Sequence, residues 1–214
     1  MRTLYSYWRS SAAYRVRIAL NLKGLAYRTE PVNLLEGGGL QNTAQYQALN
    51  PQGLVPLLVD PGAPPLAQSL AIIEYLDQVY PQPALLPESP LERTQLRALA
   101  LHVACEIHPL NNLRVLQYLQ GELGATDEEK NAWYRHWLSE GLEAVEQGLS
   151  LRPDGFSLGD RPGYLEAVLI PQLYNARRYQ VALSRWPRLA NLEALCLALP
   201  AFQDAAPEAQ PDAL

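Results

Sequence analysis

The sequence contains little cysteine and no long apolar run. Its two cysteines, Cys105 and Cys196, stand far apart, so they provide neither a disulfide framework nor the spacing of a metal site. Such a pair is typical of a protein that folds in a reducing cytosol, and we expect a cytoplasmic location. No stretch approaches the ~18 apolar residues of a membrane span. The opening residues MRTLYSYWRSS lack the apolar centre of a secretory signal, so we expect no membrane contact.

The sequence also lacks an excess of basic residues. Lys and Arg number 17 and Asp and Glu number 22, which gives a net charge of −5. General binding to the phosphate backbone of nucleic acids needs a basic face, so we expect no nucleic-acid partner. The 48% hydrophobic and 18% charged residues are an ordinary globular balance. A chain of 214 residues is long enough for one large or two small domains with a real core.

Periodicity and punctuation divide the chain into two parts with different compositions. The first part mixes strand and helix patterns. Strands are expected at 2–8, at 26–33, from 57 onward and, as a short strand, after Pro64-Pro65, and helices at 11–23, near 40–48 and at 69–79. A proline-rich stretch follows, and every later pattern is helical, with helices beginning near 89, 126, 163 and 187. We therefore predict an α/β domain at 1–81, a linker at 82–88 and an all-helical domain at 89–214.

Several helix boundaries can be predicted from capping residues. Ser69 is the expected N-cap of the helix at 69–79. Ser89 and Thr126, each followed by glutamate three residues later, form capping boxes, and the first of these opens a helix expected to run to about 120. Pro171 predicts a kink or break. The tail from 204 is expected to lie on the surface or fray.

Two pairs of polar residues stand at helix starts, where free amides and the helix dipole favour anions. Arg9, Ser10 and Ser11 lie between the first strand and the first helix, and Gln68 with Ser69 opens a later helix. Hydroxyls at the first position suit a thiolate, a phosphate or a carboxylate, and the second pair suits the carboxylate of an α-amino acid. Serine is also a preferred N-cap, so simple capping is the competing interpretation of both.

Three further features are ambiguous by themselves. The proline of Val55-Pro56 precedes a strand and is either cis or an ordinary trans turn. His108 and Asn112, four residues apart, share a helix face and form either a site or a polar seam between helices. His102 and His108 do not share a face, and we predict no metal site. Arg177-Arg178 suits either an anionic substrate or a solvated helix end.

Taken together, segments along nearly the whole chain resemble the zeta class of the glutathione transferase superfamily, which includes maleylacetoacetate and maleylpyruvate isomerases. The segments are LYSYWRSSAAYRVRIALNLKG (4–24), QALNPQGLVPLL (47–58), QSLAIIEYLD (68–77), EIHPLNNLRVLQYL (106–119) and PQLYNARRYQVAL (171–183). The resemblance implies a thioredoxin-like domain that binds glutathione, an all-helical domain that supplies most of the second-substrate site, and a homodimer.

The resemblance also implies roles for individual residues. Ser10 would hydrogen-bond the glutathione sulfur, with Ser11 beside it, and Val55, before a cis Pro56, would pair with the cysteinyl backbone. Gln68 and Ser69 would hold the γ-glutamyl group, and Gln41 would contact the glycine end. The residues of the helical domain that would line the glutathione and substrate clefts are His108, Asn112, Leu113 and Arg114.

The sequence departs from the zeta pattern in two places. Ala12 stands where zeta enzymes usually have cysteine, so any role of that thiol is absent here. Gly163 occupies the usual Thr or Ser position before a helix, with Glu166 three residues later. Half of that capping box is therefore missing, which costs about a few tenths of a kcal/mol.

The implied activity is glutathione-dependent cis–trans isomerisation of a maleyl keto-diacid in the breakdown of aromatic compounds. Arg9, Arg114 and Arg177 are candidates for binding its two carboxylates, with Arg178 as the alternative to Arg177. Conjugation or dehalogenation of small electrophiles such as α-halo acids is the alternative activity, and a non-catalytic glutathione-binding module is the alternative from a different class. The sequence does not choose between maleylacetoacetate and maleylpyruvate.

Overall fold

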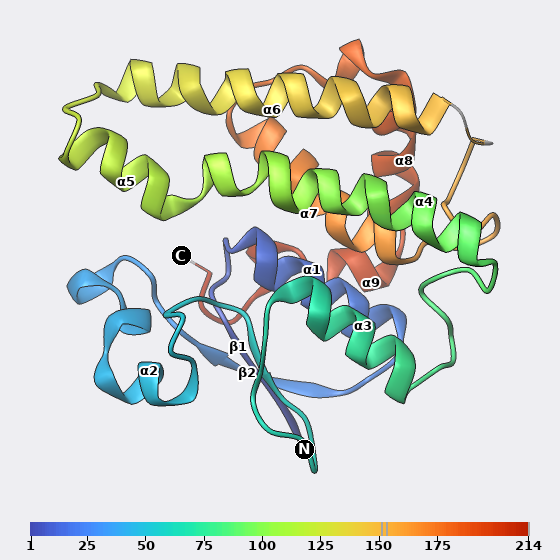
Figure 1. The fold of residues 1–214 in the computed structure, drawn as a ribbon, viewed down its shortest axis with the longest axis horizontal. Helices are drawn as coiled ribbons and strands as arrows, with labels where there is room; N and C mark the ends of the chain where they lie inside the picture. Colours follow the sequence, from blue (N-terminus) through green and yellow to red (C-terminus); the bar gives the residue numbers. More distant parts are fainter. Residues whose placement is uncertain (151, 153, 214) are drawn as a thin grey trace. The chain divides into compact units, whose positions relative to one another are not determined.

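The computed structural model describes residues 1–150, 152 and 154–213, and the chain divides into two compact units. Unit 1 comprises residues 1–85 together with the carboxyl-terminal segment that begins at Leu197, and unit 2 comprises residues 86–196. Each unit is described by itself below. The α/β architecture of the first part and the helical architecture of the second are confirmed (Figure 1).

Unit 1 is built on a four-stranded sheet with the strand order β2-β1-β3-β4. The strands are β1 (Arg2–Ser6), β2 (Tyr27–Pro31), β3 (Leu57–Val59) and β4 (Leu66–Ala67). β1 and β2 are parallel, whereas β3 is antiparallel to both β1 and β4. Leu57 pairs with Tyr5 on one side and with Ala67 on the other. The end of β1, the start of β3 and the end of β4 therefore meet at one end of the sheet.

Three helices accompany this sheet: α1 (Ser11–Leu22), α2 (Ala44–Leu49) and α3 (Ser69–Val79). Helices α1 and α3 pack side by side (Figure 1). Helix α1 ends as predicted, because Gly24 adopts a φ of +62°, a conformation that glycine tolerates at little cost. The fully buried residues include Leu4, Leu58, Ile18, Leu20, Ile72, Ile73 and Leu76.

The first part of unit 1 ends at residue 85, which is later than the predicted linker start at 82. Hydrogen bonds to charged side chains hold the first residues of the predicted linker. The Nζ atom of Lys23 donates to Asp77 Oδ1 at 2.9 Å and to the carbonyl oxygen of Pro83 at 2.8 Å. The N–H of Leu85 donates to the same Asp77 oxygen at 2.7 Å. Residues 82–85 are thereby tied to α1 and α3.

The chain after Leu197 differs from its prediction, since it belongs to unit 1 and not to the helical part. It contains helix α9 (Pro200–Gln203), and Phe202 and Ala205 are fully buried. Asn21 Nδ2 on α1 donates to the carbonyl oxygen of Ala201 at 3.0 Å. Of the two alternatives predicted for the tail from 204, lying on the surface or fraying, fraying does not occur at residues 204–213, because Ala205 is fully buried and its carbonyl oxygen accepts from Arg17.

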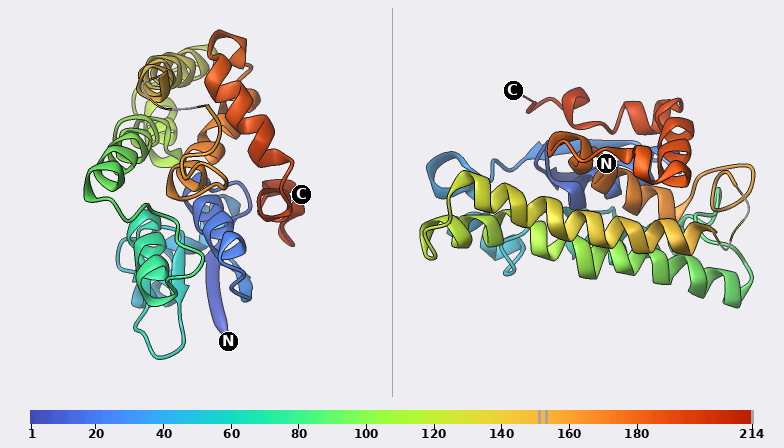
Figure 2. Two further views of the ribbon diagram at one scale, coloured as in Figure 1. Left: turned by 90° about the vertical axis from the view of Figure 1, so that its right-hand side faces the viewer. Right: turned by 90° about the horizontal axis from the view of Figure 1, so that it is seen from above.

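Unit 2 consists of helices α4 (Pro90–Leu101), α5 (Leu113–Gly121), α6 (Asp127–Ser150), α7 (Tyr164–Arg178) and α8 (Pro187–Leu197). Helix α6 runs antiparallel to α4 and α5 (Figures 1 and 2). The capping box that opens α6 is confirmed: Thr126 Oγ1 accepts from the N–H of Glu129 at 3.2 Å, and the Glu129 carboxylate accepts from the N–H of Thr126 at 2.8 Å.

The single helix predicted from about 90 to 120 is interrupted. A π-helical turn (His102–Ile107) and a 3₁₀ turn (Pro109–Asn111) separate α4 from α5. The N–H of His108 donates five residues back, to Val103, and Pro109 has no N–H with which to continue an α-helix. Asn112 then starts α5 by accepting from the N–H of Arg114 at 3.2 Å. Pro109 and Asn112 were the sequence signals for this break.

Helix α7 continues through Pro171, so the predicted break does not occur. Its start depends on Glu166, which is fully buried. The Glu166 carboxylate accepts from the N–H of Gly163 at 2.8 Å, from the N–H of Ser157 at 2.6 Å and from the Ser157 hydroxyl at 2.7 Å. Gly163 contributes no side-chain cap, as predicted, but the reciprocal half of the box remains.

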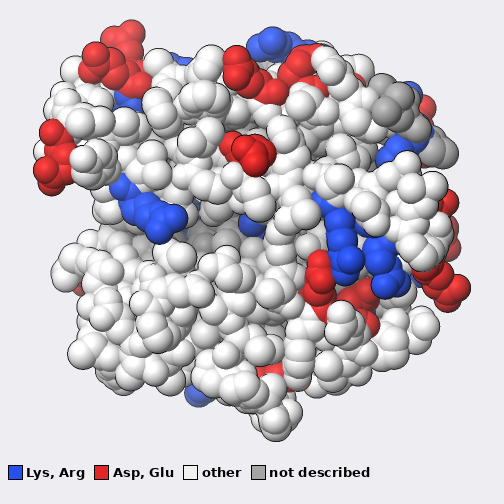
Figure 3. Space-filling view, in the orientation of Figure 1, with Lys and Arg blue, Asp and Glu red and all other residues white. Residues whose placement is uncertain are grey.

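The surface of the described residues carries charges of both signs. On the face in Figure 3, Lys and Arg side chains are interspersed with Asp and Glu. Within the described part of the chain, no helix combines the length and apolar character needed to cross a membrane. The same residues contain no group of three or more His, Cys, Asp and Glu suited to a metal ion.

Replacement of Glu166 by glutamine should destabilise unit 2. The amide would put a donor against the N–H groups that the carboxylate now accepts from, so we expect a loss of about 2 kcal/mol in the free energy of unfolding. Thermal and urea unfolding followed by circular dichroism measure this change. Glu88→Gln removes the same charge from an exposed position and should stay within about 0.5 kcal/mol of the parent. Equal free energies of unfolding for the two variants would contradict the assigned role of Glu166.

Candidate active site

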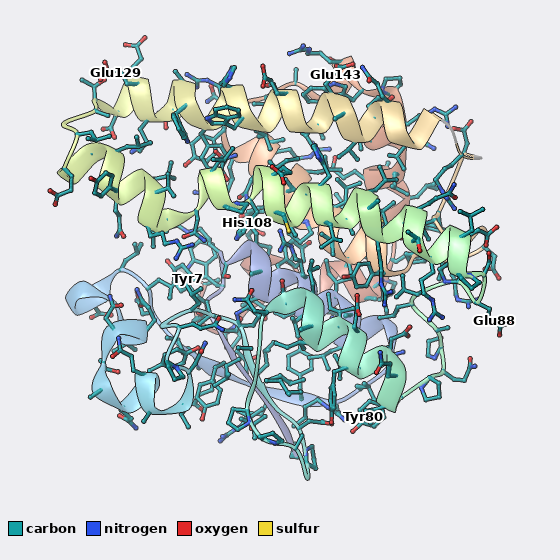
Figure 4. The ribbon with its side chains drawn as sticks, viewed as in Figure 1. Tyr7, Tyr80, Glu88, His108, Glu129 and Glu143 are labelled. Carbon is teal, nitrogen blue, oxygen red and sulfur yellow. The ribbon has the colours of Figure 1, made fainter. Side chains whose placement is uncertain are left out.

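The turn from β1 into α1 presents the hydroxyl of Ser10. Ser10 is the N-cap of α1, and its Oγ accepts from the N–H of Ala13 at 3.2 Å. Its own N–H donates to the carbonyl oxygen of Tyr7 at 2.9 Å; Tyr7 is labelled in Figure 4. A hydroxyl that accepts one hydrogen bond still has a proton to donate. Capping and donation to an anion are therefore compatible at this position.

The start of α1 favours negative charge. The helix contains 12 residues and has no acidic residue in its first turn, so the positive end of its dipole is not neutralised from within the helix. Ser11 is the first helical residue and is buried. An anion placed near Ser10 would meet the positive end of the helix dipole and a hydroxyl donor.

The segment before β3 contains the Val55-Pro56 peptide bond, which is cis, as the resemblance implied. The carbonyl oxygen of the preceding Leu54 accepts from the Tyr46 hydroxyl at 2.7 Å and from Asn50 Nδ2 at 2.8 Å. Burial raises the pKa of Tyr46 to about 12, so this hydroxyl remains a donor at neutral pH. Tyr7 and Val55 belong to one buried cluster, which places Val55 beside the end of β1.

Gln68 and Ser69 open α3, but their roles differ from the prediction. The N-cap is Gln68, with a φ of +70°, and Ser69 is the first helical residue. A left-handed conformation in a residue other than glycine is uncommon and occurs often at functional sites. The Gln68 side chain is exposed and its Nε2 donates to Gln52 Oε1 at 2.6 Å.

Arg15 lies next to the candidate site, although no sequence motif predicted it there. Its side chain is buried, with 2% of the residue exposed, and its Nη1 donates to Ser69 Oγ at 3.3 Å. A buried guanidinium next to the start of α3 adds positive charge to an end of a helix that already favours anions. The signal in the sequence was the pair of arginines, Arg15 and Arg17, in the otherwise apolar pattern RVRIAL.

Gln41 lies on a 3₁₀ turn, Leu40–Asn42, that is close to the segment leading to Val55. A Cβ added at Gly53 would lie 3.3 Å from the backbone oxygen of Gln41. Gln41 Nε2 donates to the carbonyl oxygen of Leu34 at 3.4 Å. Its Oε1 is buried and has no hydrogen-bond partner among the described residues, which leaves an acceptor for a ligand N–H.

These pieces form one site in unit 1 because of the strand register. Ser10 follows β1, Val55 precedes β3 and Gln68 follows β4, and these three strand ends meet through Leu57 and its partners. The predicted residues that the structure brings to this end of the sheet are Ser10, Ser11, Val55, Gln68 and Ser69, with Gln41 on the adjoining loop.

Of the predicted residues of unit 2, His108 and Asn112 lie in the interruption between α4 and α5, and Leu113 and Arg114 are the first two residues of α5. Asn112 is half-buried and serves as the N-cap of α5, Leu113 is half-buried and Arg114 is exposed. His108, labelled in Figure 4, is half-buried. Asn112 thus has a structural role of its own, and the ligand contacts of all four residues stay predictions.

The candidate cations differ in what holds them. The Arg9 guanidinium stacks over the Trp8 ring, 4.8 Å from its centroid. Arg177 forms a two-bond ion pair with Glu193, in which Nε donates to Oε1 at 2.9 Å and Nη2 donates to Oε2. These bonds raise the pKa of Arg177. Arg178 Nη1 donates to Asn175 Oδ1 at 3.3 Å. Neither arginine is shown to bind substrate, and Arg177 has a structural partner that the sequence did not reveal.

Comparisons with known proteins agree with this geometry. Residues 9–79 match the family model for the glutathione S-transferase N-terminal domain. The probable maleylacetoacetate isomerase of Vibrio cholerae is 53% identical over 210 residues, which cover 98% of this chain and 97% of that protein.

Solved structures give the same result. A holo maleylpyruvate isomerase, described as a bacterial glutathione S-transferase of the zeta class, superposes with a TM-score of 0.94 at 46% identity and covers 99% of this chain and 100% of its own. The maleylacetoacetate isomerase of Methylobacterium extorquens, solved with bound malonate and glutathione, has a TM-score of 0.93 at 38% identity, with 99% of each chain covered. This chain therefore belongs to the glutathione S-transferase family, and within it to the zeta class.

Proposed function

We propose that this protein is a glutathione-dependent cis–trans isomerase that acts on a maleyl keto-diacid, such as maleylacetoacetate or maleylpyruvate. The observation that carries the proposal is the Ser10 hydroxyl at the start of α1, which accepts from the N–H of Ala13 and keeps its own proton for donation. The relatives named as isomerases of these two substrates support the choice of reaction.

The residues at this end of the sheet fit glutathione. The start of α1 and Ser10 suit its sulfur, and the backbone before cis Pro56 suits its cysteinyl amide groups. The start of α3, with Arg15 behind Ser69, suits the γ-glutamyl carboxylate because amides and a guanidinium both favour an anion. The unpartnered Oε1 of Gln41 offers an acceptor to an N–H near the glycine end.

The role of Ser10 follows from thiol chemistry. A thiol with a pKa of about 8.5 is only a few per cent ionised at pH 7, whereas donors and a helix N-terminus lower that pKa to ~3.5–7.5. When bound, glutathione supplies a sulfur nucleophile that adds to the cis double bond and leaves unchanged after rotation about the resulting single bond. Ser10 and the first amides of α1 would hold this sulfur in its ionised form.

The two carboxylates of the substrate call for cations. Arg9 adjoins Ser10, and Arg114 is exposed, so both have guanidinium groups suited to bidentate carboxylate binding. Binding of a dicarboxylate is supported by the malonate in the Methylobacterium extorquens relative. Arg177 would need to bind substrate with the guanidinium N–H groups that do not donate to Glu193. We further propose that the protein works as a homodimer in the cytoplasm. Light scattering of the purified protein would test whether it is a dimer.

Purified protein should isomerise maleylacetoacetate or maleylpyruvate with glutathione present in far less than stoichiometric amount. Loss of the cis isomer and appearance of the fumaryl product are followed by absorbance, and free thiol is titrated at the end. An isomerase leaves the thiol content unchanged. Consumption of one thiol per molecule of electrophile, for maleyl substrates or for an α-halo acid, would instead identify a conjugating transferase, and binding without either reaction would identify a binding module.

Two substitutions of Ser10 should separate capping from catalysis. Ser10→Ala removes the cap and should cost about 1 kcal/mol in the free energy of unfolding, whereas Ser10→Gly should cost only about a few tenths of a kcal/mol. Both remove the donor and should lower kcat/KM by about 10²-fold, with little change in glutathione affinity by calorimetry. If kcat/KM instead fell in parallel with the free energy of unfolding, so that Ser10→Gly kept most of its activity, the hydroxyl would act only as a helix cap.

Gly39→Ala should weaken glutathione binding through Gln41. A Cβ at Gly39 would lie 2.4 Å from both amide atoms of the Gln41 side chain, and Gly39 has a φ of +91°. The side chain must therefore move, and we expect a rise of about tenfold in the KM for glutathione with kcat nearly constant. Gly62→Ala is the control, because Gly62 also has a positive φ, of +82°, but no heavy atom lies within 4 Å of its added Cβ. Equal KM values for glutathione in the two variants would show that Gln41 does not contact glutathione.

A further inference from the structure

The loop Tyr7–Ser10, called the catalytic loop below, is held by residues far away in the sequence. The N–H of Trp8 donates to Asp212 Oδ2 at 3.0 Å. The carbonyl oxygen of Trp8 accepts from Arg17 Nη2 at 3.0 Å. Both backbone groups of one loop residue are therefore bound by charged side chains, one from α1 and one from the carboxyl-terminal segment, whose end lies beside this loop (Figure 1).

Arg17 connects the catalytic loop to the carboxyl-terminal segment. Its side chain is fully buried, its Nε donates to the carbonyl oxygen of Ala205 at 2.9 Å, and its Nη1 donates to Ser6 Oγ at 3.0 Å. Burial lowers the pKa of Arg17 to about 10, while the charges of Asp212 and Glu208 act in the opposite direction, as do Tyr27 and Tyr14. Arg17 thus remains charged at neutral pH with acidic residues of the segment near it.

The carboxyl-terminal segment has a defined shape of its own. Gln210 Nε2 donates to the carbonyl oxygens of Asp204 and Ala206, both at 2.9 Å. The N–H of Ala213 donates to the carbonyl oxygen of Gln210 at 3.0 Å. These bonds, together with the buried Phe202, determine where Asp212 stands.

A displacement of Trp8 would reach the residues that we assign to the reaction. Ser10 is bonded through its N–H to Tyr7, at 2.9 Å, and the Arg9 guanidinium stacks on the Trp8 ring. The cap geometry of Ser10 and the position of Arg9 therefore both depend on the backbone at Trp8.

We propose that Asp212 and Arg17 are positioning residues of the active site, which act through Trp8 to aim the Ser10 hydroxyl and the Arg9 guanidinium. The inference rests on the proposed function, since it assumes a glutathione sulfur at Ser10. It makes the carboxyl-terminal segment part of the catalytic apparatus of unit 1.

Positioning and direct electrostatics predict opposite results for Asp212→Ala. Removal of a carboxylate near a thiolate would by itself lower the pKa of that thiol, because a like charge disfavours ionisation. Loss of the bond to Trp8 would instead misplace Ser10 and raise the pKa. The sign of the change in the pKa of bound glutathione therefore separates the two.

The experiment compares four full-length proteins: the parent, Asp212→Ala, Asp212→Asn and Asp204→Ala. The pKa of bound glutathione is obtained from the ultraviolet absorbance of the thiolate against pH, and kcat/KM from isomerisation against pH. We expect Asp212→Ala to raise the thiol pKa and to lower kcat/KM at neutral pH by about tenfold. Asp204 is an exposed acid of the same segment, and Asp204→Ala should match the parent.

Asp212→Asn is the conservative variant, because its amide oxygen can still accept from the N–H of Trp8. Asp212 Oδ1 is buried with no partner among the described residues. In the asparagine variant the amide nitrogen would take the place of this oxygen, so one unpaired polar atom replaces another. We expect its kcat/KM, and the acid dissociation constant of its bound thiol, to stay within about twofold of the values of the parent. If Asp212→Ala does not fold, Asp212→Glu, which keeps the charge but moves the acceptor by one methylene, should raise the thiol pKa in its place.

A lowered thiol pKa in Asp212→Ala, or an unchanged pKa with only a lower melting temperature, would overturn the inference. So would equal impairment of the alanine and asparagine variants. These outcomes are distinct from failure of the proposed function, in which the parent protein itself would not isomerise the maleyl substrates with catalytic glutathione.

Discussion

The site in unit 1 depends on the antiparallel pairing of β3 with both of its neighbours. Leu57 is bonded in register to Tyr5 and to Ala67, so segments separated by some fifty residues of chain end at the same place. A shift of one residue in either pairing would turn the side chains to opposite faces and would separate Ser10 from Val55 or Gln68. The buried cluster that contains both Tyr7 and Val55 reinforces this register.

Buried arginines are the second organising element of unit 1. Arg15 and Arg17 on α1 are both buried, with 2% and 0% of their surface exposed. A buried guanidinium is costly unless its donors are satisfied, and each of these donates to a residue that the active site uses or adjoins: Arg15 to Ser69, and Arg17 to the backbone of Trp8. Charge inside the domain thereby organises both helix starts where an anion would bind.

The prediction from sequence was accurate where the signal is local. Ser10 as a helix cap, the capping box at Thr126 and the helix stop at Gly24 are set by neighbours within a few residues. It was wrong where the decision came from elsewhere: Ser69 follows a left-handed Gln68 and is not the cap, and the helix from Pro90 is interrupted before Pro109. The ion pair of Arg177 with Glu193 was not predicted. Buried Arg15 and half-buried Asp212 were not singled out from the sequence, because their hydrogen-bond partners are 54 and 204 residues away.

The sequence by itself determined the two-part architecture, most element boundaries and the helix start at Ser10, because alternation, capping and proline act over short distances. The resemblance to the zeta class further predicted which polar residues would contact glutathione. Only the tertiary structure decided that the carboxyl-terminal segment joins the α/β unit and that Arg17 and Asp212 hold the loop before Ser10. Hydrogen bonds between distant segments form only once the chain has folded, and no local pattern encodes which carbonyl or carboxylate a buried guanidinium or amide will meet.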